Sequence, residues 1–232
     1  MLKGEGGGEA ARAGTLLPAL SPRRSESEFE PIDASASRPE QIRAAGCHLM
    51  FLKGYAGMTM RQIAALLQIK AASLYYHFPS KQEILFDLMQ ATAVELLRGL
   101  RESVASGEPP EVQLEQAIRW HVLFHTRKRE EAFISHSELR SLTPENLETI
   151  LKLRHEYEKI FDSILRSCQW ADGCTGEEPG VIRNSILTMC TATAGWFSPG
   201  GGLTAEQVAE KLWHLVRHGV FPQRAVTDHS VA

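Results

Sequence analysis

The sequence predicts an all-α protein of about nine helices, with a small three-helix module near the N-terminus and a larger helical body behind it. Apolar residues recur at every third or fourth position along most of the chain, and no stretch alternates as a half-buried strand does. Short segments rich in Gly and Pro divide this pattern into helix-sized pieces. The charge divides the chain as well, because residues 38–81 carry a net +5 whereas residues 82–232 carry a net −6.

The composition is that of a soluble globular protein. Of the 232 residues, 43% are hydrophobic and 23% are charged, which allows a sizeable core. No apolar run approaches the ~20 residues that span a bilayer, and Leu16, Leu17 and Leu20 are too interrupted to form a signal peptide. The four cysteines show no Cys-x-x-Cys spacing. We therefore expect a cytoplasmic protein with reduced thiols, no metal ion, no cofactor and no membrane partner.

Residues 1–37 are predicted to form a disordered N-terminal arm. They are rich in Gly, Ser, Pro and Glu and show no hydrophobic period. Arg23 and Arg24 could reach a polyanionic partner, or the arm could be a dispensable tail. At the other end of the chain, residues 222–232 are expected to form a loose tail.

Residues 38–82 make up the predicted three-helix module. Its first helix starts near Pro39, since proline is favoured at the first helical position, and runs to about Lys53. Gly54 then ends the helix, because glycine readily adopts the left-handed conformation that follows many helices. This first helix should pack across the two shorter helices that come next.

Met58–Lys81 predicts two short helices with a tight turn between them. Thr59 can cap the first of them, and Gln68–Lys70 forms the turn. The second short helix, Ala71–Phe78, is ended by Pro79, which lacks a backbone donor and restricts the residue before it. The apolar residues that share one face of the first short helix are Ile63, Ala64 and Leu67.

A helix, a short turn and a second helix form the helix-turn-helix pattern of many DNA-binding proteins. The charge of the module suits this interpretation, because six Lys or Arg residues between Arg38 and Lys81 stand against Glu40 alone. Neutralised phosphates release counterions, and an acidic body would keep double-stranded DNA on one side of the molecule. Adjacent short helices occur in any all-α protein, however, so a helix-turn-helix motif can be assigned here only from the types of residue it contains.

Residues 42–81 resemble the signature of the TetR/AcrR family of bacterial transcriptional regulators. That signature consists of an apolar AA..LF...G helix, a T...IA segment and an LY.HF.SK segment. At these positions the chain has Ala45, Gly46, Leu49, Met50, Gly54, Thr59, Ile63, Ala64, Leu74, Tyr75, Tyr76, His77, Phe78, Ser80 and Lys81. Gly46 and Met50 depart from the first segment, and the other two segments are intact. The resemblance implies a ligand-responsive, DNA-binding repressor rather than an enzyme.

The resemblance also implies which residues contact operator DNA. They are Thr59, Arg61, Lys70, Ser73, Tyr75, Tyr76, His77 and Lys81. Tyr75 could equally be a packing residue. The sequence departs from the family at the turn, where a glycine is usual and Gln68 stands, and at the start of the reader helix, where Lys70 replaces the usual Ser or Thr. We therefore expect a weak cap at this helix.

The body, residues 83–221, is predicted to be helical throughout. Its first helix runs from Gln82 to about Val104, so it starts in the module and should link the two parts mechanically. Thr143 should cap a later helix, and Thr204 should form a capping box with Gln207. The remaining predicted helices are 114–129, 131–141, 144–168, 179–197 and 204–220.

The family resemblance implies a homodimer formed by residues 179–197 and 204–220. Both segments are apolar over a wide arc, and the small residues of Thr191–Gly195 permit close approach. The same arc could also be core within one chain. A twofold dimer would read an inverted-repeat operator.

The resemblance further implies a cavity for a small-molecule effector inside the body. The candidate ligand-binding residues are aromatic or polar residues at helical spacing, although each could be an ordinary core or surface residue. They are Trp120, Phe124, Phe133, Arg140, Arg154, Met189 and Trp196. Glu138–Asn146, Arg154-x-x-Tyr157 and Gly195–Thr204 are similar to family members that respond to acyl-CoA thioesters from fatty-acid or sterol breakdown. That similarity implies an acyl-CoA-type effector.

Two other classes of function compete with this interpretation. His121 and His125 have the spacing of two ligands on one metal ion, as in a metal-responsive regulator, but no paired cysteines or carboxylates join them. A small helical enzyme would need a nucleophile elbow, a phosphate loop or an HExxH motif, and the sequence contains none of these. The sequence therefore predicts no catalytic and no metal-binding residues.

Overall fold

The structure is a computed structural model that describes residues 35–104, 107–168 and 179–220. Within these ranges every regular element is a helix, which confirms the predicted all-α fold. Most of the predicted arm, all of the predicted tail and Cys174 lie outside the described residues.

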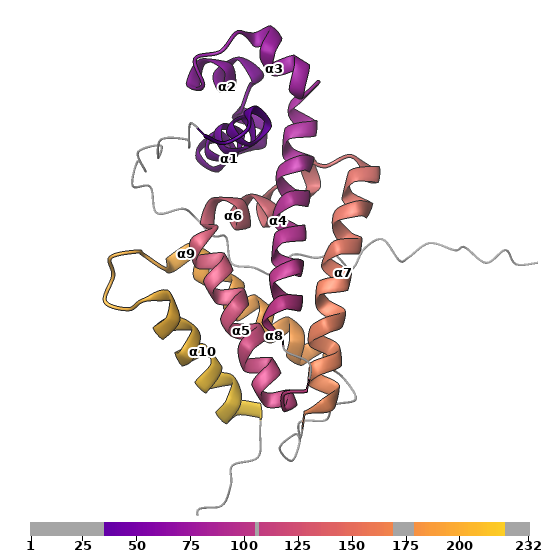
Figure 1. The fold of residues 1–232 in the computed structure, drawn as a ribbon, viewed down its shortest axis with the longest axis vertical. Coiled ribbons are helices and arrows are strands. Elements are labelled where there is room, and N and C mark those ends of the chain that lie inside the picture. The colour runs from indigo at the N-terminus through magenta and orange to yellow at the C-terminus, as the bar shows by residue number, and fades with distance from the viewer. Residues whose placement is uncertain (1–34, 105–106, 169–178, 221–232) are drawn as a thin grey trace, which may run out of the picture.

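The helices form an elongated molecule with the first three at one end (Figure 1). Helix α4 leaves that end and runs through the body, where the later helices surround it. In chain order the elements are α1 (Arg38–Gly57), α2 (Met60–Leu66), α3 (Ala71–His77), α4 (Lys81–Ser103), α5 (Pro110–Arg127), α6 (Arg129–Ser137), the 3-10 turn η1 (Leu139–Ser141), α7 (Pro144–Ser167), α8 (Pro179–Thr191), α9 (Thr193–Trp196) and α10 (Ala205–Val220).

Side-chain caps explain where several helices begin. The Thr59 hydroxyl accepts a hydrogen bond from the backbone N–H of Gln62 at 3.3 Å, as the sequence predicts. Thr143 does the same at the start of α7. Ahead of α10 the predicted capping box is confirmed, because the Thr204 N–H donates to the Gln207 side chain and the Gln207 N–H donates to the Thr204 hydroxyl.

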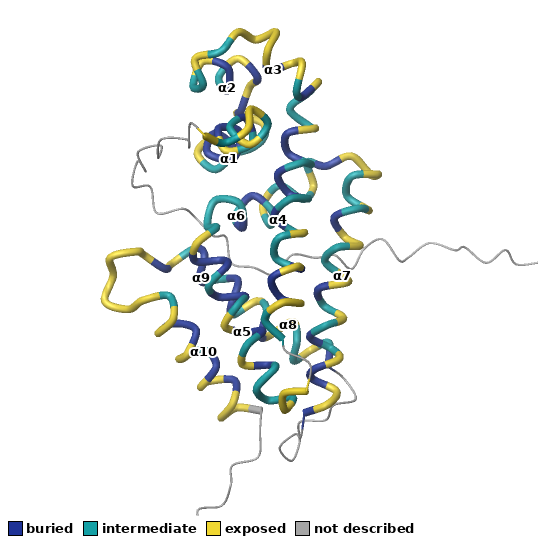
Figure 2. The backbone as a smooth tube through the Cα atoms, viewed as in Figure 1, coloured by how far each residue is buried: buried dark blue, intermediate teal, exposed yellow. Residues whose placement is uncertain are grey.

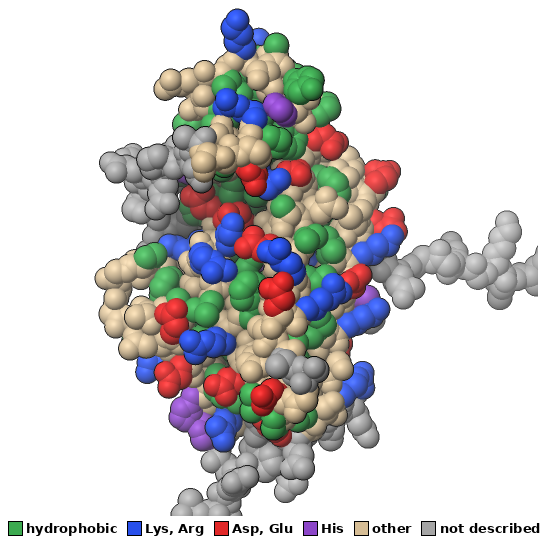
Figure 3. Space-filling model, viewed as in Figure 1, with side chains coloured by type: hydrophobic (Ala, Val, Ile, Leu, Met, Phe, Trp, Pro, Cys, Tyr) green, Lys and Arg blue, Asp and Glu red, His purple; other side chains and the backbone are tan. Residues whose placement is uncertain are grey.

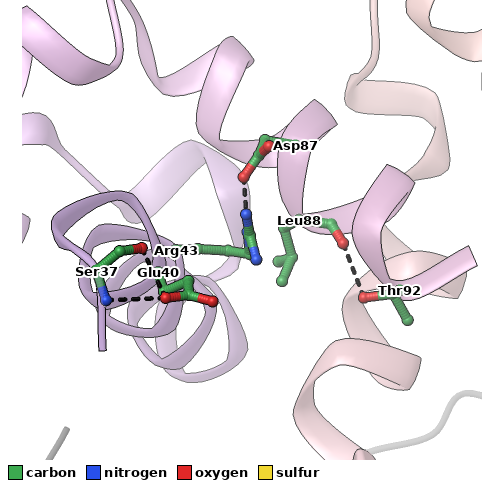
Figure 4. Close-up of polar contacts among 6 residues, drawn as sticks. All are labelled: Ser37, Glu40, Arg43, Asp87, Leu88 and Thr92. Carbon is green, nitrogen blue, oxygen red and sulfur yellow. Dashed lines mark hydrogen bonds and ion pairs between the residues drawn. The ribbon is translucent and has the colours of Figure 1, made fainter. Parts of the chain in front are cut away.

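Helix α1 is longer than predicted and contains one break. At its start the N–H and the hydroxyl of Ser37 donate to the Glu40 carboxylate at 2.8 and 2.6 Å (Figure 4). The predicted stop at Gly54 is a real interruption, since Gly54 has a φ of +71°. The chain then resumes a last helical segment that ends at Gly57, so the glycine kinks the element without ending it.

The turn between α2 and α3 places an ordinary residue in a backbone conformation that glycine usually takes. Gln68 has a φ of +55°, and no other non-glycine residue in the described ranges has a positive φ. This conformation costs an L-residue roughly 1–2 kcal/mol. Lys70 starts α3 without any side-chain hydrogen bond to the helix, which confirms the expected weak cap.

The single helix predicted over residues 179–197 is wrong, because the segment is divided into α8 and α9. The buried hydroxyl of Thr193 donates to the carbonyl of Cys190 at 2.7 Å and so occupies a backbone acceptor. The guanidinium Nε of Arg129, on α6, donates to the carbonyl of Ala194 at 2.9 Å. Two backbone carbonyls near the break, those of Cys190 and Ala194, therefore accept hydrogen bonds from side chains.

The buried side chains form two hydrophobic clusters that share α4. Figure 2 shows that the buried residues lie both among α1–α4 and along the helices of the body. The reader core lies among α1–α4 and includes Ile84 and Leu88 of α4. The body core lies among α4, α5, α7, α8 and α10 and includes Leu97 and Leu100 of α4. The reader core does not stop at the expected boundary of residue 82, since the body residues that complete it are Ile134, Leu142 and Ile150.

Helices α4 and α5 approach closely at Gly99. The indole of Trp120 lies over this glycine, and its Nε1–H donates to the carbonyl of Leu96 at 2.9 Å. A Cβ atom added at Gly99 would lie only 2.0 Å from a ring carbon of Trp120. Because the indole is fixed at both its ring and its N–H, it cannot move aside cheaply.

We predict that Gly99→Ala lowers the free energy of unfolding by roughly 2 kcal/mol, because overpacking in a close helix contact costs about 1–3 kcal/mol. Gly202→Ala is the matched control, since no atom lies within 4 Å of a Cβ there. Urea unfolding followed by circular dichroism measures both. Equal stability of the two variants would contradict the proposed contact.

Candidate functional site

The α2–turn–α3 segment forms an exposed end of the molecule (Figure 1). Helix α3 buries Leu74, and Phe78 follows it into the reader core, so most of the remaining α3 surface faces solvent. The predicted DNA residues that are exposed at this end are Thr59, Arg61, Lys70, Ser73, Tyr75 and Tyr76. His77 is half-buried beside Tyr76, with ring centroids 5.1 Å apart. The structure thus brings these seven predicted residues together.

The two tyrosines of α3 are unusually exposed for their type. The exposed fraction is 85% for Tyr76 and 50% for Tyr75. Tyrosine is generally intermediate in burial, so a bare tyrosine pair on a reader helix is available to contact a partner. Of the two interpretations of Tyr75, contact residue or packing residue, its exposure favours contact.

The reader end lacks negative charge. Residues 41–82 contain no Asp or Glu. Figure 3 shows basic side chains and no acidic ones at the α2–α3 tip, whereas charges of both signs are mixed over the body. A surface of this kind attracts a polyanion and does not repel it locally.

Lys81 differs from the other predicted DNA residues because its ammonium is used inside the module. Its Nζ donates to the carbonyls of Tyr55 and Met58, at 3.1 and 3.5 Å. The same ammonium lies 4.4 Å from the centroid of the Tyr55 ring. Lys81 therefore ties the loop between α1 and α2 to the start of α4. Its predicted contact with DNA stays a prediction, and its internal contacts give it a second, structural role.

A cavity of about 190 Å³ lies inside the body, between the two cores. It is bordered by five helices, α4 to α8, and most of its surface is apolar. Its lining residues are Met89, Thr92, Ala93, Leu96, His121, Phe124, His125, Ala132, Ser135, His136, Ile150, Leu153, Arg154, Tyr157, Glu158, Leu187, Thr188 and Thr191. The position is that of a small-molecule site, since it is concave, mainly apolar and edged by a few polar groups.

Three neutral histidines border the cavity. Burial holds the pKa of His121 well below its usual value, and it lowers the pKa of His125 to about 4 and that of His136 to about 3. The positive charge of Arg154 lowers the last two further. The His121 and His125 rings are stacked with centroids 4.0 Å apart, an arrangement that two imidazolium ions would oppose. All three rings are therefore uncharged at neutral pH.

The His121 ring is fully engaged with protein hydroxyls. Its Nδ1 lies 2.9 Å from the hydroxyl of Tyr157, and its Nε2 lies 2.9 Å from the hydroxyl of Thr191. His125 Nδ1–H donates to the carbonyl of His121 at 2.8 Å. The considered pairing of His121 and His125 on a metal ion therefore conflicts with the contacts of His121. No group of three or more His, Cys, Asp or Glu residues with metal-ligand geometry occurs in the described ranges.

Arg154 brings a cation to the polar side of the cavity. Burial lowers the pKa of its guanidinium, and the negative charge of Glu158 partly opposes that shift. Its Nη2 donates to the main-chain carbonyl of Ser135. The Ser135 hydroxyl is buried at the cavity wall and has no hydrogen-bond partner in the structure. The cavity wall thus includes both a guanidinium and a hydroxyl without a hydrogen-bond partner.

The family comparisons agree with this geometry. Residues 42–88 match the family model described as "Bacterial regulatory proteins, tetR family", and residues 107–220 match the "Tetracyclin repressor-like, C-terminal domain". The two matches together cover more than half of the chain. The chain belongs to the TetR family. None of its described helices is both long and apolar enough to cross a membrane.

Relatives of this TetR-family chain are similar along most of their length. The HTH-type transcriptional repressor KstR2 of Rhodococcus jostii is 24% identical over 178 residues, which is 72% of this chain and 83% of the relative. KstR2 of Mycobacterium tuberculosis is also 24% identical, over 79% of this chain and 93% of the relative.

Two solved structures are similar in fold. The ketosteroid transcriptional regulator KstR2 of Mycobacterium tuberculosis superposes with a TM-score of 0.74 at 21% identity, over 81% of this chain and 96% of that one. AibR, solved in complex with isovaleryl coenzyme A and operator DNA, superposes with a TM-score of 0.69 at 26% identity, over 77% of this chain and 97% of that one.

Two of the seven predicted ligand residues, Phe124 and Arg154, line the cavity of this TetR-family body. The other five do not. Trp120 covers Gly99, Phe133 packs edge-on against Phe51 of the reader, and Met189 packs against the body core. Arg140 is exposed on η1, and Trp196 is 56% exposed at the end of α9. Their positions differ from the expected ones for one reason, which is that helical spacing does not reveal which neighbour a helix face meets.

The polar residues that the ligand prediction omitted could have been found from their place on apolar faces. The polar lining residues outside the seven predicted ligand residues include His121, His125, Ser135, His136, Tyr157 and Thr191. His121 and Tyr157 occupy positions whose helical neighbours, such as Ile118 and Phe161, are fully buried. A buried polar group needs a hydrogen-bond partner, and the side chains of His121 and Tyr157 lie within hydrogen-bonding distance of each other.

We predict that the histidine cluster makes this fold sensitive to acid. Unfolded histidines take up protons near pH 6.5, whereas His125 and His136 do so only near pH 4 and 3 in the folded chain. Between those values the unfolded state binds more protons, so the free energy of unfolding rises with pH. Their contribution is fully present above pH 6.5 and is lost as the pH falls towards 4.

The measurement is urea unfolding between pH 4.5 and 7.5. His136→Gln should flatten the acid side of the stability curve by on the order of 1–3 kcal/mol, because glutamine does not titrate. His155→Gln is the control, since His155 is exposed on α7 and should leave the slope unchanged. An unchanged slope in His136→Gln would show that this ring is not held neutral.

Proposed function

We propose that this protein is a transcriptional repressor that binds operator DNA through α2 and α3 and leaves it when a small molecule occupies the body cavity. The observation that carries the proposal is the position of α4. The helix contributes Met89, Thr92, Ala93 and Leu96 to the cavity wall, and its preceding turns are buried in the reader core. An effector in the cavity therefore contacts the element that supports the DNA-binding end.

Polar contacts fix the first turns of α4 to the reader. The Nε of Arg43, on α1, lies 2.6 Å from the Asp87 carboxylate on α4 (Figure 4). Lys81 joins the start of α4 to the loop before α2. A shift of α4 at Thr92, whose hydroxyl donates to the carbonyl of Leu88, would thus move the reader with it. The ligand needs only to bind the non-DNA conformation more tightly.

The protein is proposed to act as a homodimer through residues 179–197 and 204–220. This part of the surface carries exposed apolar side chains, with Val181 65% exposed, Trp196 56% exposed and Leu215 61% exposed. Large exposed apolar side chains on these three helices, α8, α9 and α10, favour a partner that buries them. A twofold dimer would present two reader ends to an inverted repeat.

An acyl-CoA thioester is the proposed class of effector. KstR2, a relative over most of the chain, is named a ketosteroid transcriptional regulator, and AibR has been solved with isovaleryl coenzyme A. The cavity supports this class, because its wall is mainly apolar. At about 190 Å³ it is smaller than the ~300–1,000 Å³ of sites that enclose a whole drug-sized ligand. It would therefore hold the acyl group and leave the nucleotide part outside.

We predict that Arg61→Ala weakens binding to the DNA upstream of the protein's own gene about tenfold and lowers the slope of log affinity against log salt by about one, since one phosphate contact is lost. Tyr76→Ala should weaken binding to a similar extent. Fluorescence anisotropy measures both. Arg166→Ala is the control, because Arg166 is an exposed arginine of α7 in the body. Equal losses in Arg61→Ala and Arg166→Ala would point to general electrostatics instead of a reader surface.

We further predict that short acyl-CoA thioesters release the protein from that DNA and are recovered chemically intact. Ala93→Phe should retain DNA affinity and lose the response, because the added ring fills the cavity beside α4. Anisotropy titration and chromatography of the recovered thioester are the measurements. Hydrolysis of the thioester without any change in DNA affinity would indicate an enzyme and contradict the proposal.

A further inference from the structure

Arg154 is a half-buried cation without a paired anion. It lies on α7 at the cavity wall, and its guanidinium donates to the main-chain carbonyl of Ser135. Among the described residues, no carboxylate lies within the 4.0 Å of an ion pair with it. A half-buried charge in this situation is costly, because a carbonyl dipole replaces only part of the lost hydration.

The nearest acid on the same helix is committed elsewhere. Glu158, one turn after Arg154, also borders the cavity. Its carboxylate pairs with Arg183 of α8 at 3.7 Å, and Arg183 in turn donates to Asp162 at 2.5 Å. Glu158 therefore shares its charge with another cation and leaves Arg154 only partly compensated.

The other polar groups around Arg154 cannot supply a negative charge. His125 and His136 are neutral rings at this wall. Ser135, whose carbonyl holds the guanidinium, also places a buried hydroxyl at the cavity with no hydrogen-bond partner. The site thus offers a cationic donor and a hydroxyl donor, and the rest of the cavity lining includes the apolar side chains of Met89, Leu96 and Leu187.

We propose that the cavity binds a carboxylate of its effector, with the Arg154 guanidinium and the Ser135 hydroxyl as donors and the apolar wall enclosing the carbon chain. A carboxylate is the anion that matches a planar guanidinium, and it can accept hydrogen bonds at both of its oxygens. This inference rests on the proposed function only where it expects the bound carboxylate to change the affinity for DNA. Binding of the carboxylate itself depends on the cavity alone.

Two kinds of molecule carry this chemistry. One is a short free carboxylic acid, and the other is an acyl thioester with a second carboxylate at the far end of its acyl group. Isovalerate and glutaryl-CoA represent them. Isovaleramide and isovaleryl-CoA are the matched compounds in which the group that would meet Arg154 is uncharged.

The test is isothermal titration calorimetry of the full-length protein with these four compounds. We expect at least one carboxylate compound to bind tenfold or more tightly than its uncharged match. Arg154→Met should abolish that preference, and Ser135→Ala should reduce it several-fold. Arg101→Met is the control, because Arg101 is an exposed arginine that pairs with Glu156 outside the cavity. If wild type shows no preference for either carboxylate compound, or if Arg154→Met keeps it, the inference is overturned.

A thermal melt of the ligand-free variants provides a second measurement that does not need a ligand. Removing an uncompensated half-buried charge should raise the melting temperature of Arg154→Met or leave it unchanged. A large fall in melting temperature would show that Arg154 mainly serves the fold through its hydrogen bond to the Ser135 carbonyl and would overturn the inference.

DNA binding separates this inference from the proposed function. If a carboxylate compound binds in an Arg154-dependent way and DNA affinity does not change, the carboxylate site stands and the proposed effector response fails. If uncharged thioesters release DNA equally from wild type and Arg154→Met, the effector response stands and the carboxylate site fails.

Discussion

The backbone hydrogen bonds of α4 make one stiff rod, and both hydrophobic cores are built on it. At 23 residues the helix is about 35 Å long, which is enough to reach from the reader core to the far end of the body core. The cavity borders the middle of this rod, at Thr92 and Ala93, where one core gives way to the other. A local displacement there must either move one core against the other or be absorbed by a break in the helix. This constraint is what relates the cavity to the DNA-binding end.

Polar groups are divided between the two ends of the rod according to their task. At the reader, charged groups are exposed or tie elements together, as in the ion pair of Arg43 and Asp87. In the cavity the rings of His121 and His136 are kept neutral by burial, whereas Arg154 places a positive charge at the cavity wall. Buried neutral groups fix geometry at low electrostatic cost, whereas an exposed cation is best placed to meet phosphates. The same chain thus uses its polar residues in two different ways.

Much of this architecture could be predicted from the sequence, because it depends on local rules. Thr59 and Thr143 cap helices wherever they precede an apolar period, and the weak cap at Lys70 is a matter of residue type. The cavity could be predicted only in part. Trp120 has the same periodic signal as a ligand-binding aromatic, and only the glycine on the facing helix makes it a packing residue. The break between α8 and α9 likewise involves a tertiary contact, the hydrogen bond from Arg129 to the Ala194 carbonyl, since threonine also occurs inside continuous helices.

The left-handed turn at Gln68 has a meaning beyond its local strain. A glycine in that position would present bare backbone, whereas Gln68 holds an exposed amide side chain between the two reader helices. Such an amide can donate and accept, which the corresponding glycine of a related regulator cannot do with a side chain. When several regulators of one family share a cell, each must avoid the operators of the others. A side chain at this exposed turn is one place where such discrimination can be built, at the expense of about 1–2 kcal/mol of backbone strain.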